Sequence, residues 1–314
     1  MDHMRVFIAG ASGAVGSRLV PLLVAAGHEV VGSSRSAERL GAIEQAGAKG
    51  VVMDGLDAAS VRSAVVDARP DVIVHELTAL SGAAADFKHF DEAFAPTNAL
   101  RTRGTDNLLA AAADAGVVRF IAQSYTGWPN ERTGGQVKTE EDPIDPHPTD
   151  ASKETVAAIT YVERATTAAG GLALRYGQLY GPGQAIGRGG ELIAMVEAGK
   201  FPLVGGGTGI TSFCHIDDAA SATAAAVTGG PPGVYNIVDD DPAPVSEWLP
   251  ALAEVVGAKP PMHVPAWVAK ALIGEHGVSL MTKARGSSNA KAKRELDWTP
   301  VWPSWREGFR TGLG

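Results

Sequence analysis

A glycine-rich segment near the start of the chain has the residue types and spacing of a phosphate-binding loop. It runs Gly10-Ala11-Ser12-Gly13-Ala14-Val15-Gly16 and directly follows an apolar stretch that ends at Ala9. Glycine permits a tight turn at 10, backbone approach to a pyrophosphate at 13, and close helix–strand packing at 16. The alternative is a glycine-rich turn in a fold that has lost its cofactor. The residues expected to hold a dinucleotide here are Gly10, Ser12, Gly13, Ala14, Val15 and Gly16.

The end of the second expected strand indicates which dinucleotide is bound. In proteins that bind NAD, a carboxylate ~20 residues past the glycines hydrogen-bonds the ribose 2′-hydroxyl. Here the strand ends Val31-Gly32-Ser33-Ser34-Arg35, with no carboxylate. A serine pair and a guanidinium can hold a 2′-phosphate, so the sequence favours NADP(H) over NAD(H), with Ser34 and Arg35 as ligands. The alternative is that Arg35 lies over the adenine and discriminates little.

Short β-rich runs alternate with longer Ala- and Leu-rich segments in the first part of the chain. Strands are expected at 4–9, 29–32, 50–53, 71–75 and 117–123, and helices at 17–26, 36–46, 57–68 and 97–115. Alternating strands and helices imply parallel pairing with right-handed crossovers, hence a doubly wound α/β sheet. Ligands bind such sheets at the carboxyl ends of the strands, so the crevice is expected at strands one and four.

The remainder of the chain changes character twice. Residues 126–150 are rich in Gly and Pro and predict a long loop, which in a compact domain is usually functional. A helix at 152–169 and a strand at 172–176 are expected next. From 178 onward the Gly and Pro density rises and the elements shorten. We therefore expect a dinucleotide-binding domain over 1–177 and a smaller substrate-binding region over 178–314, with segments returning to the sheet.

Composition excludes several classes of function. The chain has 27 Lys and Arg against 35 Asp and Glu, a net charge of −8, which argues against binding nucleic acid or an anionic membrane. The single Cys214 excludes an internal disulfide and suits a reducing compartment. The eight histidines show no metal-ligand spacing, so no metal is expected. The sequence shows neither a signal sequence nor an apolar run near ~20 residues, so a cytoplasmic protein is expected. Its expected partner is a small-molecule substrate, and the sequence is compatible with a homodimer.

The glycine spacing GxxGxxG resembles the short-chain dehydrogenase/reductase superfamily, and the chain is similar nearly end to end to its extended or atypical branch, the NAD-dependent epimerase/dehydratase family. Together the further motifs are specific for this resemblance. They are Asp71-Val72-Ile73-Val74-His75, Asn98 with Gly104-Thr105-Asp106-Asn107-Leu108-Leu109 (similar to the family's NxxGTxNLL except in spacing), Leu174-Arg175-Tyr176-Gly177, Tyr180-Gly181-Pro182-Gly183, Phe213-Cys214-His215-Ile216-Asp217-Asp218-Ala219 and Tyr235-Asn236-Ile237.

The resemblance extends the expected cofactor site to residues outside the glycine loop. It implies that Asp54, after the third strand, lies near the adenine amino group, although a turn cap is the alternative. It places Leu77 and Thr78 in the loop on the nicotinamide side, and Tyr176 on the cofactor side of its strand.

The family reaction uses a serine, a tyrosine and a lysine, and the resemblance assigns two of the three. Ser124 takes the place of the serine that orients the substrate oxygen, and Lys153 that of the lysine, which would also hold the nicotinamide ribose. The alternative for Lys153 is a solvated lysine at a helix start. Thr149 falls at the tyrosine. A threonine hydroxyl is far less acidic than a phenol of pKa roughly 10, so it cannot serve as the usual acid or base.

Other side chains are candidates to replace that acid. Tyr125 directly follows Ser124 and is the preferred proton donor, although it can equally pack beneath the loop. Residues 213–219 resemble the family's FxHVDDxA signature, and within them His215 is expected to order backbone rather than transfer protons. The further candidates, each with a structural alternative, are Tyr176, Lys138, His147 and Asp150.

These features predict an NADP(H)-dependent oxidoreductase of the epimerase/dehydratase type that acts on a carbonyl or secondary alcohol of a small polar molecule. One alternative is an isomerase or lyase that retains its nicotinamide. Another is a non-catalytic NADP(H)-sensing protein that kept the pocket without the tyrosine. Turnover of the cofactor with a panel of carbonyl compounds separates the first from the others.

Overall fold

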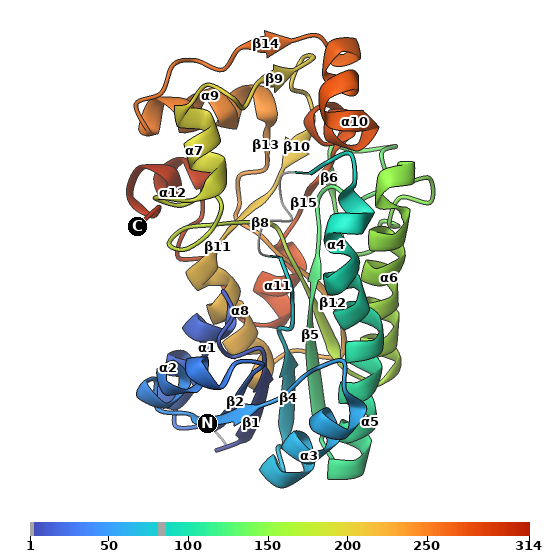
Figure 1. The fold of residues 1–314 in the computed structure, drawn as a ribbon, viewed down its shortest axis with the longest axis vertical. Coiled ribbons are helices and arrows are strands. Elements are labelled where there is room, and N and C mark those ends of the chain that lie inside the picture. Colours follow the sequence, from blue (N-terminus) through green and yellow to red (C-terminus); the bar gives the residue numbers. More distant parts are fainter. Residues whose placement is uncertain (1–2, 81–85) are drawn as a thin grey trace.

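The computed structural model describes residues 3–80 and 86–314, and its centre is a seven-stranded parallel sheet (Figure 1). The strand order is β12-β7-β5-β4-β1-β2-β3, with every pair parallel. The predicted doubly wound α/β fold is therefore confirmed. The strands are β1 (Arg5–Ala9), β2 (Glu29–Ser34), β3 (Lys49–Val52), β4 (Val72–His75), β5 (Arg119–Tyr125), β7 (Leu172–Tyr176) and β12 (Gly233–Ile237).

Helices cover both faces of the sheet, and each layer has its own apolar core. Because the sheet is covered on both sides, its central strands are apolar throughout, as β1 shows with Val6 to Ala9 fully buried. One layer contains α1 (Gly16–Ala25), α2 (Leu40–Gln45) and α8 (Ile216–Thr228). The other contains α3 (Ala58–Ala68), α4 (Phe90–Ala99), α5 (Thr105–Ala115) and α6 (Lys153–Ala168) (Figure 1).

The helical segment after β4 begins earlier than the sequence predicted. It starts at Phe90 rather than near Thr97, so that prediction was wrong. Pro96 lies inside α4, and proline is usually an indication of a helix start or end, which explains the error. Between α4 and α5 the backbone forms one π-helical turn, Leu100–Gly104. Such turns are rare and occur often at functional sites.

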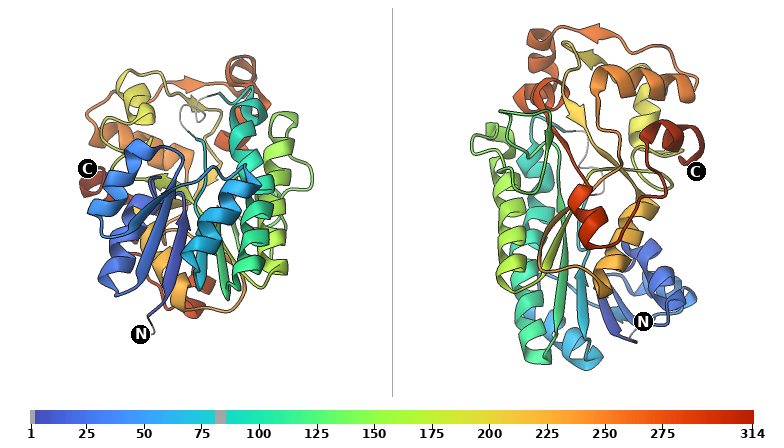
Figure 2. Two further views of the ribbon diagram at one scale, coloured as in Figure 1. Left: turned by 60° about the horizontal axis from the view of Figure 1, so that its bottom comes forward. Right: turned by 180° about the vertical axis from the view of Figure 1, so that it is seen from behind.

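The C-terminal part of the chain has a separate core beyond the carboxyl ends of the central strands (Figures 1 and 2). That core is built around Phe213, Trp248 and Trp305. Its helices are α7 (Glu191–Glu197), α9 (Val245–Val255), α10 (Ala266–Lys283) and α12 (Trp305–Thr311), joined by the short strand pairs β8 (Gln178–Tyr180) with β11 (Phe213–His215), β9 (Leu203–Val204) with β14 (His263–Val264), and β10 (Ile210–Thr211) with β13 (Ala243–Pro244). Residues beyond 178 also contribute β12 and α8 to the central sheet and its layers.

The segment 126–150 is tied to the C-terminal part. Its short strand β6 (Val137–Lys138) pairs with β15 (Gly286–Ser287). The hydroxyl groups of Thr126 and Ser287 lie 2.7 Å apart, and the Asn130 amide donates to Ser287 Oγ at 2.9 Å. The loop after β5 is therefore held in place by residues that are distant in the sequence. None of the helices described combines the length and hydropathy needed to span a bilayer.

Candidate active site

The glycine loop between β1 and α1 has a geometry that only glycine fits at two positions. Gly10 has φ +97°, and a Cβ there would lie 2.8 Å from the Glu76 carbonyl oxygen. A Cβ at Gly16 would collide with the Gly10 carbonyl oxygen. The turn is closed by Gly13, whose N–H donates to the Gly10 carbonyl at 2.9 Å, and fixed by Ser33, whose Oγ accepts from Gly10 N–H at 3.2 Å.

The loop fits a dinucleotide. Within the described part of the chain, the N–H groups of Ser12, Ala14 and Val15 donate to no protein acceptor. Val15 precedes α1 without a side-chain cap, so the helix N-terminus is also free to face an anion. Free backbone N–H groups at a helix N-terminus bind phosphate through hydrogen bonds and the helix dipole.

The end of β2 gives the expected serine pair two different environments. Ser33 is fully buried and accepts from Gly10, so it cannot also reach a 2′-phosphate, and that part of the prediction was wrong. Ser34 Oγ accepts from Ser12 Oγ at 3.0 Å. Arg35 is exposed and forms no ion pair among the residues described, which leaves its guanidinium free for a 2′-phosphate.

The other expected cofactor residues also lie at the carboxyl ends of strands. Asp54 follows β3 and is exposed, and its carboxylate accepts from Leu56 N–H at 3.0 Å as a turn cap does. After β4, Leu77 is buried and Thr78 is partly buried. Their contacts with a bound cofactor remain predictions.

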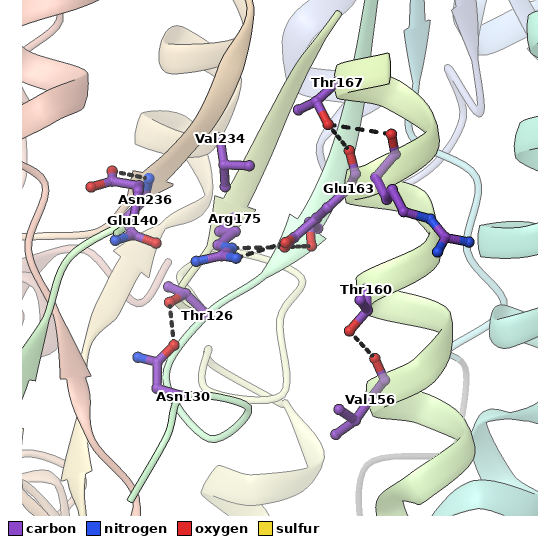
Figure 3. A network of polar contacts seen from close by, with 12 residues as sticks. Thr126, Asn130, Glu140, Val156, Thr160, Glu163, Thr167, Arg175, Val234 and Asn236 are labelled. Carbon is purple, nitrogen blue, oxygen red and sulfur yellow. Dashed lines mark hydrogen bonds and ion pairs between the residues drawn. The ribbon is translucent and has the colours of Figure 1, made fainter. Parts of the chain in front are cut away.

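Ser124 is engaged in a buried ionic network on the α6 side of the sheet. Its hydroxyl donates to Glu163 Oε1 at 2.6 Å. Glu163 also accepts two hydrogen bonds from Arg175, at 2.7 and 2.6 Å, and Figure 3 shows these two side chains facing each other from α6 and β7. All three side chains are buried. Ser124 therefore has a protein partner where the sequence analysis expected it to meet substrate.

Tyr125, the next residue, points to the opposite side of the strand, as alternation along β5 requires. Its hydroxyl donates to Gln178 Oε1 at 3.2 Å, and its ring lies 6.0 Å from the Trp128 ring. Burial raises the pKa of the Tyr125 phenol above its usual value. A phenol with a raised pKa is a weaker acid, so the geometry makes Tyr125 a modest proton donor.

Thr149 lies at the start of the turn before α6 with its hydroxyl between two neighbours. It is 2.9 Å from Ser152 Oγ and 3.1 Å from His276 Nδ1. His276 comes from α10 and is fully buried. Burial lowers the pKa of His276 to about 4, so the ring is neutral at pH 7.

Lys153 is exposed and pairs with Asp150 at 2.5 Å. Its expected contact with the nicotinamide ribose remains a prediction.

Tyr176 is not available as a proton donor to substrate. Its buried hydroxyl donates to Glu76 Oε1 at 2.6 Å and lies 2.6 Å from Thr223 Oγ1. Burial also raises the pKa of Glu76 to about 8, so this carboxyl is largely neutral at pH 7. Nothing in the sequence pattern distinguished Glu76, because the residues around its carboxyl, Tyr176 on β7 and Thr223 on α8, are distant from it in the sequence.

The other candidate acids have structural partners or are exposed. Lys138 is buried and pairs with Asp142 at 3.2 Å. His147 is exposed, and Asp150 pairs with Lys153. His215 orders backbone as predicted, since its ring accepts from Asp217 N–H and lies 3.0 Å from the Gly312 carbonyl.

Aromatic side chains that the sequence analysis did not group meet next to Thr149. Ring centroids of Phe90 and His276 are 4.3 Å apart, and Trp128 stands edge-on to both, at 5.2 and 5.1 Å. Phe94 stacks on Phe90 at 4.2 Å. With Tyr125 these residues form what we call the aromatic cluster. They come from α4, β5 and the loop after it, and α10, so no local pattern could have grouped them.

The comparison with protein families agrees with this arrangement. The model of the NAD dependent epimerase/dehydratase family matches residues 6–238. The chain belongs to this family. The prediction of an oxidoreductase that uses a nicotinamide cofactor is confirmed at this level, and the chain is an NAD(P)-dependent reductase.

Two curated relatives are also named as reductases. A 3-diazoavenalumate denitrifying reductase from Streptomyces sp. is 44% identical over 311 residues, covering 98% of this chain and 99% of its own. A 2-alkyl-3-oxoalkanoate reductase from Stenotrophomonas maltophilia is 28% identical, covering 81% of this chain and 76% of its own.

Solved structures share the fold. UDP-glucose 4-epimerase from Thermotoga maritima, crystallised with UDP-glucose, has a TM-score of 0.77 at 22% identity, covering 99% of this chain and 97% of its own. The Thermus thermophilus UDP-glucose 4-epimerase complex with NAD has a TM-score of 0.74 at 23% identity, covering 99% and 98%. At these identities the likeness concerns the fold alone.

Proposed function

We propose that this reductase uses NADPH to replace a diazo group on an unsaturated substrate with hydrogen, releasing dinitrogen. The observation that carries the proposal is Thr149, which stands where the family resemblance expects a tyrosine. Its hydroxyl lies between Ser152 and His276. Reduction of a carbonyl needs a proton donor for the alkoxide that forms, and a threonine hydroxyl is a poor one.

Reductive loss of a diazo group needs no proton donor. When bound, NADPH supplies a hydride. The carbon that carried the diazonium group gains this hydrogen with its two electrons, and the carbon–nitrogen bonding pair leaves with dinitrogen. Charge balances because the cationic diazonium becomes a neutral C–H product while the nicotinamide becomes cationic. A site in which Thr149 stands where the resemblance expects the acidic tyrosine suits this step.

The relative from Streptomyces sp. supports this choice of reaction. Its name describes a diazo compound as substrate and denitrification by reduction as activity, and its similarity to this chain extends over nearly the full length of both. The transfer of this activity to the present chain is part of the proposal.

The residues of the site have distinct roles in this reaction. The N–H groups of the glycine loop hold the diphosphate, and Lys153 is positioned at the start of α6 to turn toward the nicotinamide ribose. The aromatic cluster offers faces on which a planar acceptor can stack. It also excludes water, which would otherwise attack the electron-poor carbon that bears the diazo group.

We expect the purified protein to release one dinitrogen per NADPH oxidised when given an ortho-diazophenol (a quinone diazide). A ¹⁵N-labelled diazo group followed by mass spectrometry measures the gas, and deuterated NADPH tests hydride transfer to carbon. Thr149→Val removes the hydroxyl with little change of shape and is expected to lower turnover less than about tenfold, because no proton passes through it. A loss at Thr149→Val of more than about 100-fold would contradict the proposal, as would NADPH oxidation without labelled gas.

The second candidate is reduction of a carbonyl group on a small polar molecule. It is favoured by Tyr125, which follows Ser124 at the end of β5 and whose hydroxyl donates to Gln178 Oε1. The relative from Stenotrophomonas maltophilia is named as an oxoalkanoate reductase. If Tyr125 supplies the proton, Tyr125→Phe should reduce ketone turnover about 100-fold or more, whereas denitrification should be nearly unaffected. An isomerase that retains its cofactor, or a sensing protein, would not consume NADPH with either diazo or carbonyl compounds.

We expect NADPH to bind more tightly than NADH, because Arg35 is free to pair with a 2′-phosphate and no carboxylate ends β2. Arg35→Asp should weaken NADPH by roughly 1–3 kcal/mol, the range for hydrogen bonds to charged groups, and leave NADH nearly unchanged. Lys49→Asp makes the same charge change at the amino end of β3 and should affect neither. Calorimetric titration measures both affinities, and an equal or reversed preference would refute the assignment.

A further inference from the structure

Arg101 is a buried cation without an ionic partner. Only 7% of this residue is exposed, and it forms no ion pair within residues 3–80 and 86–314. Among the described residues its one side-chain hydrogen bond is a long one, from Nη1 to Asn98 Oδ1 at 3.5 Å, and its buried Nε has no partner there. Burying a guanidinium without a compensating anion is unfavourable, so a residue of this kind needs an explanation.

The carboxylate that acts most strongly on the Arg101 charge already has other hydrogen-bond partners. Glu163 favours the charged state of Arg101, but it pairs with Arg175 through two hydrogen bonds and accepts a third from Ser124. Burial lowers the pKa of Arg101 to about 10, which leaves it positive at pH 7. The other titratable groups on which its charge acts are His75 and Tyr125, both neutral at that pH. One positive charge is therefore left without a counter-ion.

The surroundings of Arg101 belong to the candidate active site. The turn that carries Arg101 is joined to the end of β4, because His75 Nε2 lies 3.3 Å from the Leu100 carbonyl oxygen and 3.2 Å from Thr105 Oγ1. The charge of Arg101 also acts on His75 and Tyr125, the last residues of β4 and β5. The carboxyl ends of adjacent strands are where ligands bind in such sheets. Arg101 is also three residues before Gly104, the spacing of asparagine in the NxxGT motif, whereas Asn98 is six residues before it.

We propose that Arg101 binds the carboxylate of an aromatic acid, which is the substrate of the reductase proposed above. Its planar fork matches a carboxylate with two parallel hydrogen bonds. Tyr125, on which the Arg101 charge acts, belongs to the aromatic cluster, so the proposal brings a cation and aromatic rings to one ligand. The cofactor is not a suitable counter-ion, because its phosphates bind at the glycine loop and its reduced nicotinamide is uncharged. The inference rests on the proposed function only in treating the ligand as the substrate.

Binding measurements without turnover test this inference. The NADP⁺-loaded protein is titrated by calorimetry with 4-hydroxycinnamate and with its neutral amide, 4-hydroxycinnamamide. We expect at least tenfold tighter binding of the carboxylate and loss of that preference in Arg101→Met, with amide and NADP⁺ affinities unchanged. Arg103→Met is the matched control, because Arg103 lies in the same turn but is exposed. It should behave as the unmodified protein.

A thermal melt of the same variants separates binding from a structural role. Methionine replaces a buried unpaired charge with an apolar chain of similar length, so the melting temperature of Arg101→Met should rise. Equal binding of both probes, no binding of the carboxylate, or a lower melting temperature with unchanged carboxylate affinity would each overturn the inference. If carboxylate binding depends on Arg101 but no dinitrogen is released, only the proposed reaction fails.

Discussion

Gly13→Val is expected to abolish dinucleotide binding while leaving the fold in place. Gly13 does not have a positive φ, so a β-branched residue can adopt its backbone conformation. A Cβ there would lie 3.1 Å from the Gly10 carbonyl oxygen, a tight contact but not a collision. The branches of valine would project from the loop where a pyrophosphate must touch the N–H groups. We expect the NADPH affinity to fall by at least about 100-fold, or roughly 2.7 kcal/mol.

Two further glycine variants make this result specific. Gly41→Val lies on exposed α2 with open space around its Cβ, so NADPH binding should be unchanged. Gly16→Val should instead fail to fold, because its Cβ would collide with the Gly10 carbonyl. Fluorescence titration with NADPH and circular-dichroism melts distinguish the three. Normal NADPH binding by folded Gly13→Val would show that this loop is not the cofactor site.

The sequence predicted the parts of this protein that depend on local order. The glycine loop, its strand and its helix lie within one continuous segment, so turn chemistry and periodicity are sufficient to recognise them. The helix start at Phe90 was missed because Pro96 is tolerated inside α4. The π turn was missed because it leaves no compositional mark.

The chemistry of the site depends on contacts between distant segments, and these were not predictable from one sequence. Thr149 and His276 are separated by 127 positions but share a hydrogen bond. Ser124 was chosen by resemblance to a motif, yet its partner Glu163 lies on another element. Side-chain direction in such cases is decided by tertiary packing and burial, which spacing along the chain does not encode.

The second large effect is expected at Glu163, whose removal should destabilise the whole sheet–helix interface. Glu163 and Arg175 are each 6% exposed, and their two hydrogen bonds join α6 to β7. Glu163→Ala would leave Arg175 buried without an anion and remove the partner of Ser124. Breaking a buried pair in this way costs about 3–5 kcal/mol. Urea unfolding of the variant measures the loss. Glu154→Ala, at an exposed position of the same helix, should cost less than about 1 kcal/mol.

A double variant separates the value of the ion pair from the penalty of breaking it. In Glu163→Leu with Arg175→Met, both charges of the pair are replaced by apolar side chains, so neither partner is left as an unpaired buried charge. Such replacements are often nearly neutral, and the double variant should recover most of the stability lost in Glu163→Ala. Ser124 would still lack its acceptor, which costs about 1–3 kcal/mol for a buried hydroxyl. Adding Ser124→Ala should remove that remainder. Equal destabilisation of the single and double variants would instead show that the pair itself, rather than the unpaired charge, determines the stability of this interface.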